Sequence, residues 1–390
     1  MRGAKRSAKN TAKNISLLVL CGLMGVLCAV NWLMGLNIAQ MPADKRENSK
    51  MMVLNRKDRT ISHKHFYDIV DFIESDALLV MNNTKVLPAR LIGHKDTGAK
   101  IEVFLLKQAD DQSLEDGMQD PIGRMQRLRY CYWDVLIKPS KRVSPDTIVK
   151  ISDELSVRVI KRLEDNGEWL VELLFEGDNV LDVLHRNGNI PLPPYIERKI
   201  QNDDLKKLDF ERYQTVYAKD EGSVAAPTAG LHFTKEILKK LQDKGVELCE
   251  VTLNVGLGTF RPVQCENVLE HKMHSETFEI SEQASEQINR ALREGRKIVA
   301  VGTTTVRTLE TAFQKFGCIK PCHDSSELFI YPPYEFKVVD NLITNFHLPK
   351  STLLMLVSAL AGKDFIFEAY KEAIENKYRF FSYGDCMYIE

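Results

Sequence analysis

The sequence predicts an α/β protein in which a small antiparallel β module is inserted into a mostly parallel α/β domain. The chain has 390 residues, 44% hydrophobic and 27% charged, which is enough apolar material for two or three domains. Short strand-like runs separated by turn residues fill residues 88–175. After the rigid segment 191–194, strands alternate with helices, which is the pattern of parallel α/β domains.

The N-terminal extension, residues 1–37, differs from the rest of the chain. It begins with basic residues, and residues 15–38 then form an apolar run as long as the roughly 20 residues that cross a bilayer. Three interpretations stay open: a membrane anchor, a secretory signal and a spurious extension. No small-x-small cleavage site follows the run, which disfavours a secretory signal. Lys45, Arg46 and Lys50 add positive charge on the second flank, so the orientation of an anchor is not specified.

Residues 38–87 are predicted to begin the α/β domain. A helical pattern places four apolar residues on one face: Phe66, Ile69, Val70 and Ile73. Residues 77–81 form a short apolar run that stops at three polar residues. Such a run is typical of a buried strand whose end opens into a site.

Residues 88–175 are predicted to form the inserted β module, a small barrel or sandwich. Its expected strands are residues 101–106, 130–137, 147–151, 155–160 and 169–175. Turn signals such as Asn166-Gly167 separate several of them. The acidic stretch 109–123 is expected to be a loop insertion.

Residues 176–390 are predicted to complete the α/β domain. Thr234 is a suitable N-cap for a helix over 234–244, and Gly245 ends that helix. The other expected helices are residues 281–294, 306–316, 353–361 and 365–376. The expected strands are residues 248–255, 297–301 and 342–346.

Charge and cysteine content argue against several classes of protein. The net charge of −1 and pI of about 6.8 disfavour a globally basic protein that coats RNA, so nucleic-acid contact must come from a local patch. The eight cysteines are scattered, which is typical of reduced intracellular thiols rather than a disulfide scaffold. Cys318, Cys322 and His323 have no second pair nearby, so we predict no metal site.

Polar clusters follow four predicted strands and indicate one shared cleft. In parallel α/β architectures, ligands bind beyond the carboxyl ends of the strands. The clusters are Asn82-Asn83-Thr84, Gly256-x-Gly258-Thr259, Gly302-Thr303-Thr304-Thr305-x-Arg307 and Asn345-Phe346-His347. The two glycines of the second cluster lack the third glycine of a dinucleotide fingerprint, so an ordinary tight turn is an equal alternative.

The segment 227–233 directly precedes the helix predicted over 234–244. Small residues there let backbone N–H groups approach a ligand, and a helix N-terminus favours an anionic group. These small residues are Thr228, Ala229 and Gly230. His232 is a candidate proton carrier at neutral pH, and the alternative is a histidine that only packs beside Phe233.

The pattern His-x-x-His-x-Glu is formed by His271, His274 and Glu276. A zinc protease would need His-Glu-x-x-His on a helix, which is absent. We therefore interpret the pair as proton-transfer or substrate-binding residues, with a surface loop as the alternative.

Single charged side chains add further candidates. Arg90, Arg307 and Arg379 suit a phosphate or a carboxylate, because the guanidinium fork matches both, although each on its own is more often a surface residue. Asp385 is a candidate general base if it reaches the cleft. Nearby aromatic residues, Tyr383 among them, either stack on bases or close the core.

Seven motifs taken together resemble one known family, the S-adenosylmethionine:tRNA ribosyltransferase-isomerases of queuosine biosynthesis. The motifs occupy residues 82–90, 217 with 222–233, 251–263, 271–276, 300–310, 344–353 and 378–385. The resemblance runs from about Ile38 to the C-terminus. Two departures stand out: the apolar run replaces a short Leu-Pro-containing segment, and Pro333 stands where the family has glycine.

The resemblance implies a reaction, a fold and partners. The family transfers the ribosyl part of S-adenosylmethionine to 7-aminomethyl-7-deazaguanine at the tRNA wobble position and isomerises it, giving epoxyqueuosine with release of adenine and methionine. It implies a barrel-like α/β domain, residues 38–87 and 176–390, with a small β-barrel, residues 88–175, inserted. The partners are tRNA and S-adenosylmethionine, a consumed substrate, with no metal or cofactor. We expect a cytoplasmic monomer, with membrane contact through residues 15–38 as the lesser alternative.

On this basis we predict two sets of site residues. The expected catalytic residues are His232, His274, His347 and Asp385. The expected substrate-binding residues are Asn82, Asn83, Thr84, Arg90, Thr228, Ala229, Gly230, Asn254, Gly256, Gly258, Thr259, His271, Gly302, Thr303, Arg307, Asn345 and Tyr383.

Two rival functions come from different classes. An S-adenosylmethionine-dependent methyltransferase would have a glycine-rich loop after the first strand of a doubly wound sheet, which the sequence lacks. A membrane-tethered RNA-binding module without catalysis accounts for the apolar run but leaves the polar strand ends unexplained.

Removal of residues 1–37 is expected to leave turnover unchanged, because tRNA and S-adenosylmethionine are both cytoplasmic and no motif of the set lies in this segment. The measurement is turnover of the truncated and full-length chains, with fractionation of cells that express the full chain. Loss of turnover in a folded truncated chain, or recovery of the full chain on the outer membrane face, would contradict the prediction.

Overall fold

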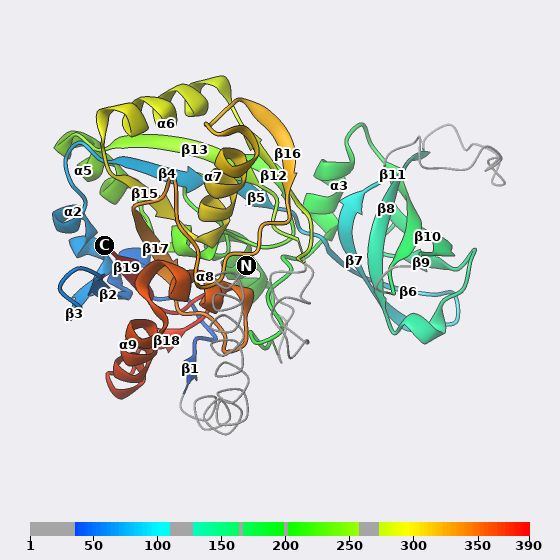
Figure 1. Cartoon of the computed structure of the whole chain (residues 1–390). Helices are drawn as coiled ribbons and strands as arrows, with labels where there is room; N and C mark the ends of the chain where they lie inside the picture. The colour runs from blue at the N-terminus through cyan, green and yellow to red at the C-terminus, as the bar shows by residue number, and fades with distance from the viewer. Residues whose placement is uncertain (1–35, 110–127, 164–166, 199–201, 257–272) are drawn as a thin grey trace, which may run out of the picture.

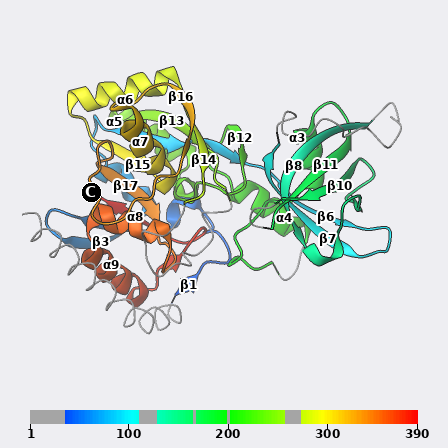
Figure 2. The same ribbon diagram turned by 45° about the vertical axis from the view of Figure 1, so that its right-hand side comes forward.

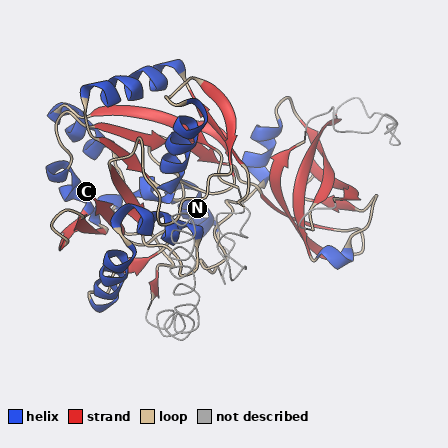
Figure 3. Ribbon diagram, viewed as in Figure 1, coloured by secondary structure: helices blue, strands red, loops and turns tan. Residues whose placement is uncertain are grey.

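The computed structural model describes residues 36–109, 128–163, 167–198, 202–256 and 273–390. Figure 1 shows a large α/β body with a smaller β body projecting from one side. The rotated view of Figure 2 shows the same two bodies joined at a narrow neck. Most helices lie in the larger body (Figure 3). The predicted fold class, an α/β domain with an inserted antiparallel barrel, is confirmed.

The α/β body is built on a nine-stranded sheet. Its strand order is β16 (Cys322–Ser326), β14 (Glu276–Ile280), β13 (Glu247–Leu253), β4 (Leu78–Asn82), β15 (Ile298–Val301), β17 (Asn341–Asn345), β19 (Cys386–Ile389), β2 (Lys50–Asn55) and β3 (Thr60–His65). The central strands β13, β4, β15 and β17 are parallel. Strands β16 and β3 are edges, so this sheet is not closed into a ring.

The central strands bury both faces, because helices cover the sheet on each side. Leu78 and Val80 of β4 belong to the core that includes helices α6 (Glu282–Glu294), α7 (Thr303–Phe316), α8 (Thr352–Ala361) and α9 (Lys363–Glu375). Leu79 and Met81 belong to the opposite core with α2 (Ile69–Phe72) and α5 (Lys235–Lys244). Side chains alternate between the two faces of a strand, so a strand covered on both sides must be apolar throughout.

The ends of α5 follow the predicted signals. The Thr234 side chain accepts a hydrogen bond from the backbone N–H of Ile237 at 3.2 Å, and Gly245 closes the helix in the left-handed region with φ of 106°. Such a cap satisfies N–H groups that have no partner within the helix. Ser281 caps α6 in the same way.

Helix α7 begins earlier than the predicted residue 306. Gly302, with φ of 88°, turns the chain directly after β15, and Thr303 is already helical. The polar residues 303–305 therefore form the first turn of a helix rather than a loop.

The inserted β body is a closed six-stranded barrel. Its strand order is β10 (Leu155–Arg162), β11 (Trp169–Glu176), β8 (Leu128–Lys138), β7 (Lys100–Gln108), β6 (Arg90–His94) and β9 (Ile148–Lys150). Five of these strands were predicted, and β6 was missed. In β6 a Cβ on Gly93 would lie 2.4 Å from the Lys150 carbonyl oxygen, so closure against β9 needs a glycine that weakens the strand pattern. Most of the predicted loop insertion, residues 110–123, lies outside the described residues.

Two adjacent segments join the barrel to the α/β body. The chain enters from β5 (Thr84–Val86) and leaves through α3 (Val180–Asn187) and later α4 (Asp203–Arg212) to β12 (Asp220–Ser223), which pairs in parallel with β5. Arg90 and Asn189 form an isolated bridge at the neck. A Cβ on Gly188 would lie 1.9 Å from the Pro88 carbonyl oxygen, so the entering and leaving segments touch there.

The described part of the N-terminal region begins with a short strand that pairs with the C-terminal segment. β1 (Asn37–Ile38) pairs in parallel with β18 (Arg379–Phe380). The apolar run before residue 36 lies outside the described residues. Within residues 36–390, excluding the gaps named above, no helix is long and apolar enough to cross a membrane.

Gly188→Ala is expected to destabilise the protein by about 3 kcal/mol, because the added methyl group meets backbone that cannot rotate away. The matched control is Gly317→Ala, whose Cβ would meet nothing within 4 Å. Its expected cost is only the backbone strain of a side chain at φ of 71°, about 1–2 kcal/mol. Urea unfolding measures both losses. Equal losses would show that the neck does not need this close approach.

Candidate active site

A pocket at the carboxyl ends of the parallel strands is the main candidate site, and we call it the main pocket. It encloses about 680 Å³, part of it open to solvent. Residues that directly follow or end β13, β15 and β17 form its walls, together with the segment 226–229. Six of the predicted site residues line it: Thr228, Ala229, Gly302, Thr303, Asn345 and His347.

The start of α7 supplies one wall of the main pocket. The Gly302 amide donates to the Ile343 carbonyl at 2.8 Å, which fixes the turn between β15 and the helix. Thr303 and Thr304 follow and line the pocket, so the positive end of a 14-residue helix faces the space. A substrate group with negative charge or lone pairs is favoured at this wall.

His232 is buried beside the pocket and both ring nitrogens are already hydrogen-bonded. Nδ1 lies 2.7 Å from Ser49 Oγ, and Nε2 lies 3.3 Å from Asn345 Nδ2. Burial, together with the positive charges of Arg379 and Arg46, lowers the pKa of His232 to about 3. The imidazole is therefore neutral at pH 7, and in this conformation both of its nitrogens are engaged by protein groups.

His347 lines the main pocket itself. Its Nε2 lies 2.8 Å from Thr344 Oγ1, and its backbone N–H donates to the Tyr370 hydroxyl at 2.6 Å. Burial lowers the pKa of His347 to about 3, so this ring is also neutral at pH 7. These contacts fix the ring plane at the pocket wall.

The other two predicted catalytic residues lie elsewhere. His274 is exposed just before β14. Asp385 is buried, and its carboxylate accepts from the backbone N–H groups of Lys50 and Arg379 at 3.0 and 2.8 Å and pairs with the Arg379 guanidinium at 3.2 Å. These contacts join β2 to the C-terminal segment, so Asp385 is a structural anchor in this conformation and does not line the pocket.

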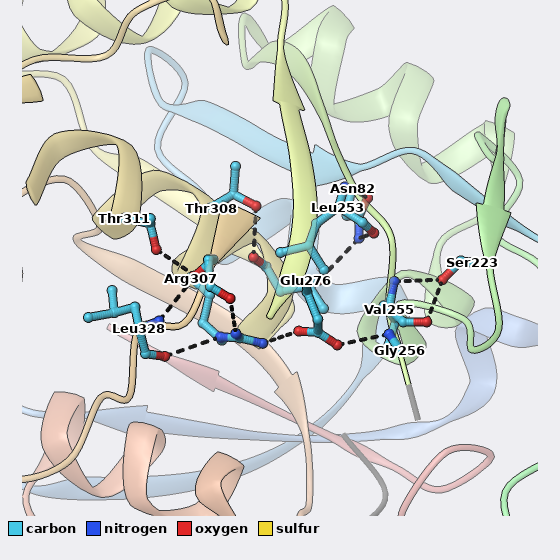
Figure 4. Close-up of polar contacts among 12 residues, drawn as sticks. Asn82, Ser223, Leu253, Val255, Gly256, Glu276, Arg307, Thr308, Thr311 and Leu328 are labelled. Carbon is cyan, nitrogen blue, oxygen red and sulfur yellow. Dashed lines mark hydrogen bonds and ion pairs between the residues drawn. The ribbon is translucent and has the colours of Figure 1, made fainter. Parts of the chain in front are cut away.

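Arg307 was predicted to bind an anionic substrate group, but in the structure it forms an ion pair with a carboxylate of the protein itself. Figure 4 shows Glu276 of β14 pointing at Arg307 of α7, and the two form a buried ion pair. The guanidinium also donates to the backbone carbonyls of Ser326 and Leu328. Glu276 in turn accepts from the Gly256 N–H at 2.9 Å. The pair thus ties a helix to two strand ends behind the pocket.

The first polar cluster also holds strand ends together. The Asn82 side chain donates to the Leu253 carbonyl at 3.0 Å and to Thr304 Oγ1 at 3.3 Å. Thr84 Oγ1 donates to Asn254 Oδ1 at 2.9 Å. Neighbouring Asn83 donates to Asp220 and Glu250 carboxylates. These side chains support the walls and do not line the pocket.

The remaining predicted binding residues are distributed as follows. Arg90 lies on the barrel and pairs with Glu102 at 2.9 Å. Gly230 lies so close to Tyr217 that a Cβ would meet its hydroxyl at 2.1 Å. The predicted residues Gly258, Thr259 and His271 lie outside the described residues.

A smaller cavity adjoins the main pocket, and we call it the arginine cavity. Arg46, Arg212 and Arg379 line it together with His232, and Tyr383 lies there with its hydroxyl donating to Asp209 at 3.2 Å. Arg46 and Arg212 mostly donate to backbone carbonyls, for example Arg46 to Leu231 and Arg212 to Ala43. Sequence analysis missed both arginines, because partners more than 160 residues away leave no local pattern.

Tyr195 is a further pocket residue that sequence analysis missed. Its hydroxyl lies 2.6 Å from Ser382 Oγ, and its ring lies 4.9 Å from that of Phe381. Burial raises the pKa of Tyr195 to about 12, so the hydroxyl stays protonated. Tyr195 belongs to no helix or strand, and only the preceding prolines mark its position.

Comparison with known proteins identifies the family. The profile described as queuosine biosynthesis protein matches residues 33–389. The S-adenosylmethionine:tRNA ribosyltransferase-isomerase of Clostridioides difficile (strain 630) is 46% identical over 356 residues, covering 90% of this chain and 96% of that protein. The protein of the same name from Acetivibrio thermocellus is 49% identical over 356 residues, with the same coverage.

The chain belongs to the S-adenosylmethionine:tRNA ribosyltransferase-isomerase family. The resemblance found in the motifs is thereby confirmed. Among solved structures, an S-adenosylmethionine tRNA ribosyltransferase from Thermotoga maritima is 35% identical, covers 90% of this chain and 96% of its own, and has a TM-score of 0.47.

The family's motifs meet at the main pocket. Five of the seven supply lining residues: those at 222–233, 251–263, 300–310, 344–353 and 378–385. The other two motifs contact helix α7 rather than the pocket. The motif at 82–90 does so through the hydrogen bond of Asn82 to Thr304, and the motif at 271–276 through the ion pair of Glu276 with Arg307. The motifs thus have two roles: most supply residues of the pocket wall, and two supply residues that support it.

Arg307→Met is expected to destabilise the α/β body by about 3–5 kcal/mol, because the buried Glu276 carboxylate loses the guanidinium that balances its charge. The double variant Glu276→Gln with Arg307→Met is expected to recover part of this loss. Lys239→Met is the control, since its ion pair with Asp243 is exposed and contributes less than about 1 kcal/mol.

Urea unfolding followed by far-ultraviolet circular dichroism measures these losses. Trp133 and Trp169 lie in the barrel, and the third tryptophan, Trp32, lies outside the described residues, so fluorescence in a Trp32→Phe background reports the barrel separately. An Arg307→Met loss no larger than that of Lys239→Met would show that the buried pair does not hold the strand ends.

Proposed function

We propose that the chain transfers the ribosyl part of S-adenosylmethionine to 7-aminomethyl-7-deazaguanine at the wobble position of tRNA and isomerises it to give epoxyqueuosine-tRNA, with release of adenine and methionine. The observation that carries the proposal is family membership over residues 33–389. It is supported by a pocket at the carboxyl ends of the parallel strands, to whose described lining five of the family's seven motifs contribute.

The reaction needs groups that bind substrate atoms and groups that move protons. The sulfonium of S-adenosylmethionine acidifies the hydrogens at C5′, and adenine leaves more easily when an acid protonates it. The attacking aminomethyl group must be neutral. A positioned proton carrier contributes roughly 10²–10⁴ in rate to such steps.

His347 is the residue to which we assign proton transfer. Among the described lining residues, His347 and Tyr195 are the titratable ones, and Tyr195 holds its proton. The assignment rests on position, because the His347 ring lies at the wall of the main pocket, whereas His232 lies outside that wall. His232, with both nitrogens occupied, is assigned a supporting role.

We further propose that the enzyme works in the cytoplasm, because both substrates are cytoplasmic, and that it works as a monomer. S-adenosylmethionine is consumed, and the proposal involves no metal or cofactor. Residues 15–38 are not assigned a membrane contact in this proposal.

Incubation with tRNA that carries the 7-aminomethyl base and with S-adenosylmethionine is expected to give epoxyqueuosine, detected by nucleoside mass spectrometry, and equal amounts of adenine and methionine. Donor labelled in its methyl group is expected to leave its label in methionine. tRNA with unmodified guanine at the wobble position is the control and should not react. Label on the tRNA would instead establish the rival methyltransferase.

A further inference from the structure

Asn345 lines the main pocket and carries a buried amide oxygen that lacks a hydrogen-bond partner among the described residues. It ends β17, is only 2% exposed and lines the main pocket. Its Nδ2 donates to the Phe381 carbonyl at 3.0 Å and approaches His232 Nε2 at 3.3 Å. Its Oδ1 is buried without a hydrogen-bond partner in the part of the chain that the structure describes. Buried polar atoms are nearly always paired, so an unpaired acceptor at a pocket wall indicates a partner that enters the pocket.

The orientation of the Asn345 amide follows from its neighbours. A backbone carbonyl such as that of Phe381 can only accept, so the atom 3.0 Å away must be the amide nitrogen. The opposite orientation would place two acceptors in contact. Oδ1 is therefore the atom left for a ligand.

The same logic sets the proton positions around His232. Since Nε2 faces the donor of Asn345, it must accept, and Nδ1 must carry the hydrogen. Nδ1 then donates to Ser49 Oγ at 2.7 Å, and the Ser49 hydroxyl donates to the Arg46 carbonyl at 3.2 Å. Every group in this relay has one consistent role, and the relay holds the Asn345 amide in place.

We propose that Asn345 Oδ1 accepts a hydrogen bond from a neutral amino group of a substrate in the main pocket, and that His232 and Ser49 are positioning residues for it. A neutral amine fits better than an ammonium, because no carboxylate lines the described wall of the pocket. The inference rests on the proposed function, which brings two such groups: the exocyclic amine of adenine in S-adenosylmethionine and the aminomethyl nucleophile of the tRNA base.

The test variant is Asn345→Leu, which keeps the branched shape of the side chain and removes the acceptor, together with the contacts that Nδ2 makes to Phe381 and His232. Asn376→Leu is the matched control, because Asn376 is exposed and its side chain only donates to the Glu372 carbonyl. Calorimetry gives the Kd for S-adenosylmethionine without tRNA, and initial rates give kcat/KM for tRNA. Asn345→Leu is expected to lose about tenfold or more in one of the two, the effect of one buried hydrogen bond.

The two arms distinguish the source of the amine. A weaker Kd for S-adenosylmethionine assigns the contact to adenine, and a donor analogue with oxygen in place of the exocyclic amine should then bind wild type and variant equally. An unchanged Kd with reduced kcat/KM for tRNA assigns it to the aminomethyl group. A folded Asn345→Leu chain that matches Asn376→Leu in both arms overturns the inference.

The positioning role has its own readout. Ser49→Ala is expected to weaken the same arm as Asn345→Leu by a smaller factor, measured below the lowered melting temperature of the variant, with rescue by Ser49→Thr. A loss spread over both arms, or one that Ser49→Thr does not restore, would show that Ser49 only supports the fold. Failure of the proposed function is separate, since wild type would then form no epoxyqueuosine at all.

Discussion

The four central parallel strands of the α/β body are covered by helices on both faces, and this constraint decides where polar side chains can stand. Within β4 or β15, any polar residue would lie in one of two apolar cores. Polar groups therefore collect where the strands end, and because these strands are parallel, their carboxyl ends meet at one edge. The main pocket, the Asn82 contacts and the Glu276–Arg307 pair all lie at or behind that edge.

The main pocket and the arginine cavity differ in charge. The described wall of the main pocket is uncharged, whereas the adjoining arginine cavity holds three guanidinium groups. His232 lies between the two, and burial beside these cations keeps it neutral. Because the described wall carries no charged side chain, the choice among substrate groups depends on neutral hydrogen-bonding groups, and Asn345 Oδ1 is the one that we propose for a neutral amine.

Charged side chains that look catalytic in sequence mostly serve the framework. Asp385 joins β2 to the C-terminal segment, Arg307 neutralises Glu276, and Arg90 pairs within the barrel. A charge that is buried needs a partner, and the cheapest partner is one that also joins two elements. The groups left at the pocket wall are consequently neutral: backbone N–H groups at the start of α7, threonines, Asn345 and His347.

The sequence by itself determined the α/β class, the inserted β module, the helix ends at Thr234, Gly245 and Ser281, and the family. These follow from local causes: alternation along a strand, side chains that cap the next turn, and contiguous motifs. It also found the wall residues Gly302 and Asn345, because polar residues at a strand end are visible in one dimension. Only the tertiary structure decided which polar residues face the pocket and which brace it. Ser49 meets His232, and His232 meets Asn345, in each case across more than 100 residues of chain, and such contacts depend on how the sheet, the C-terminal segment and the first turn after β1 pack together.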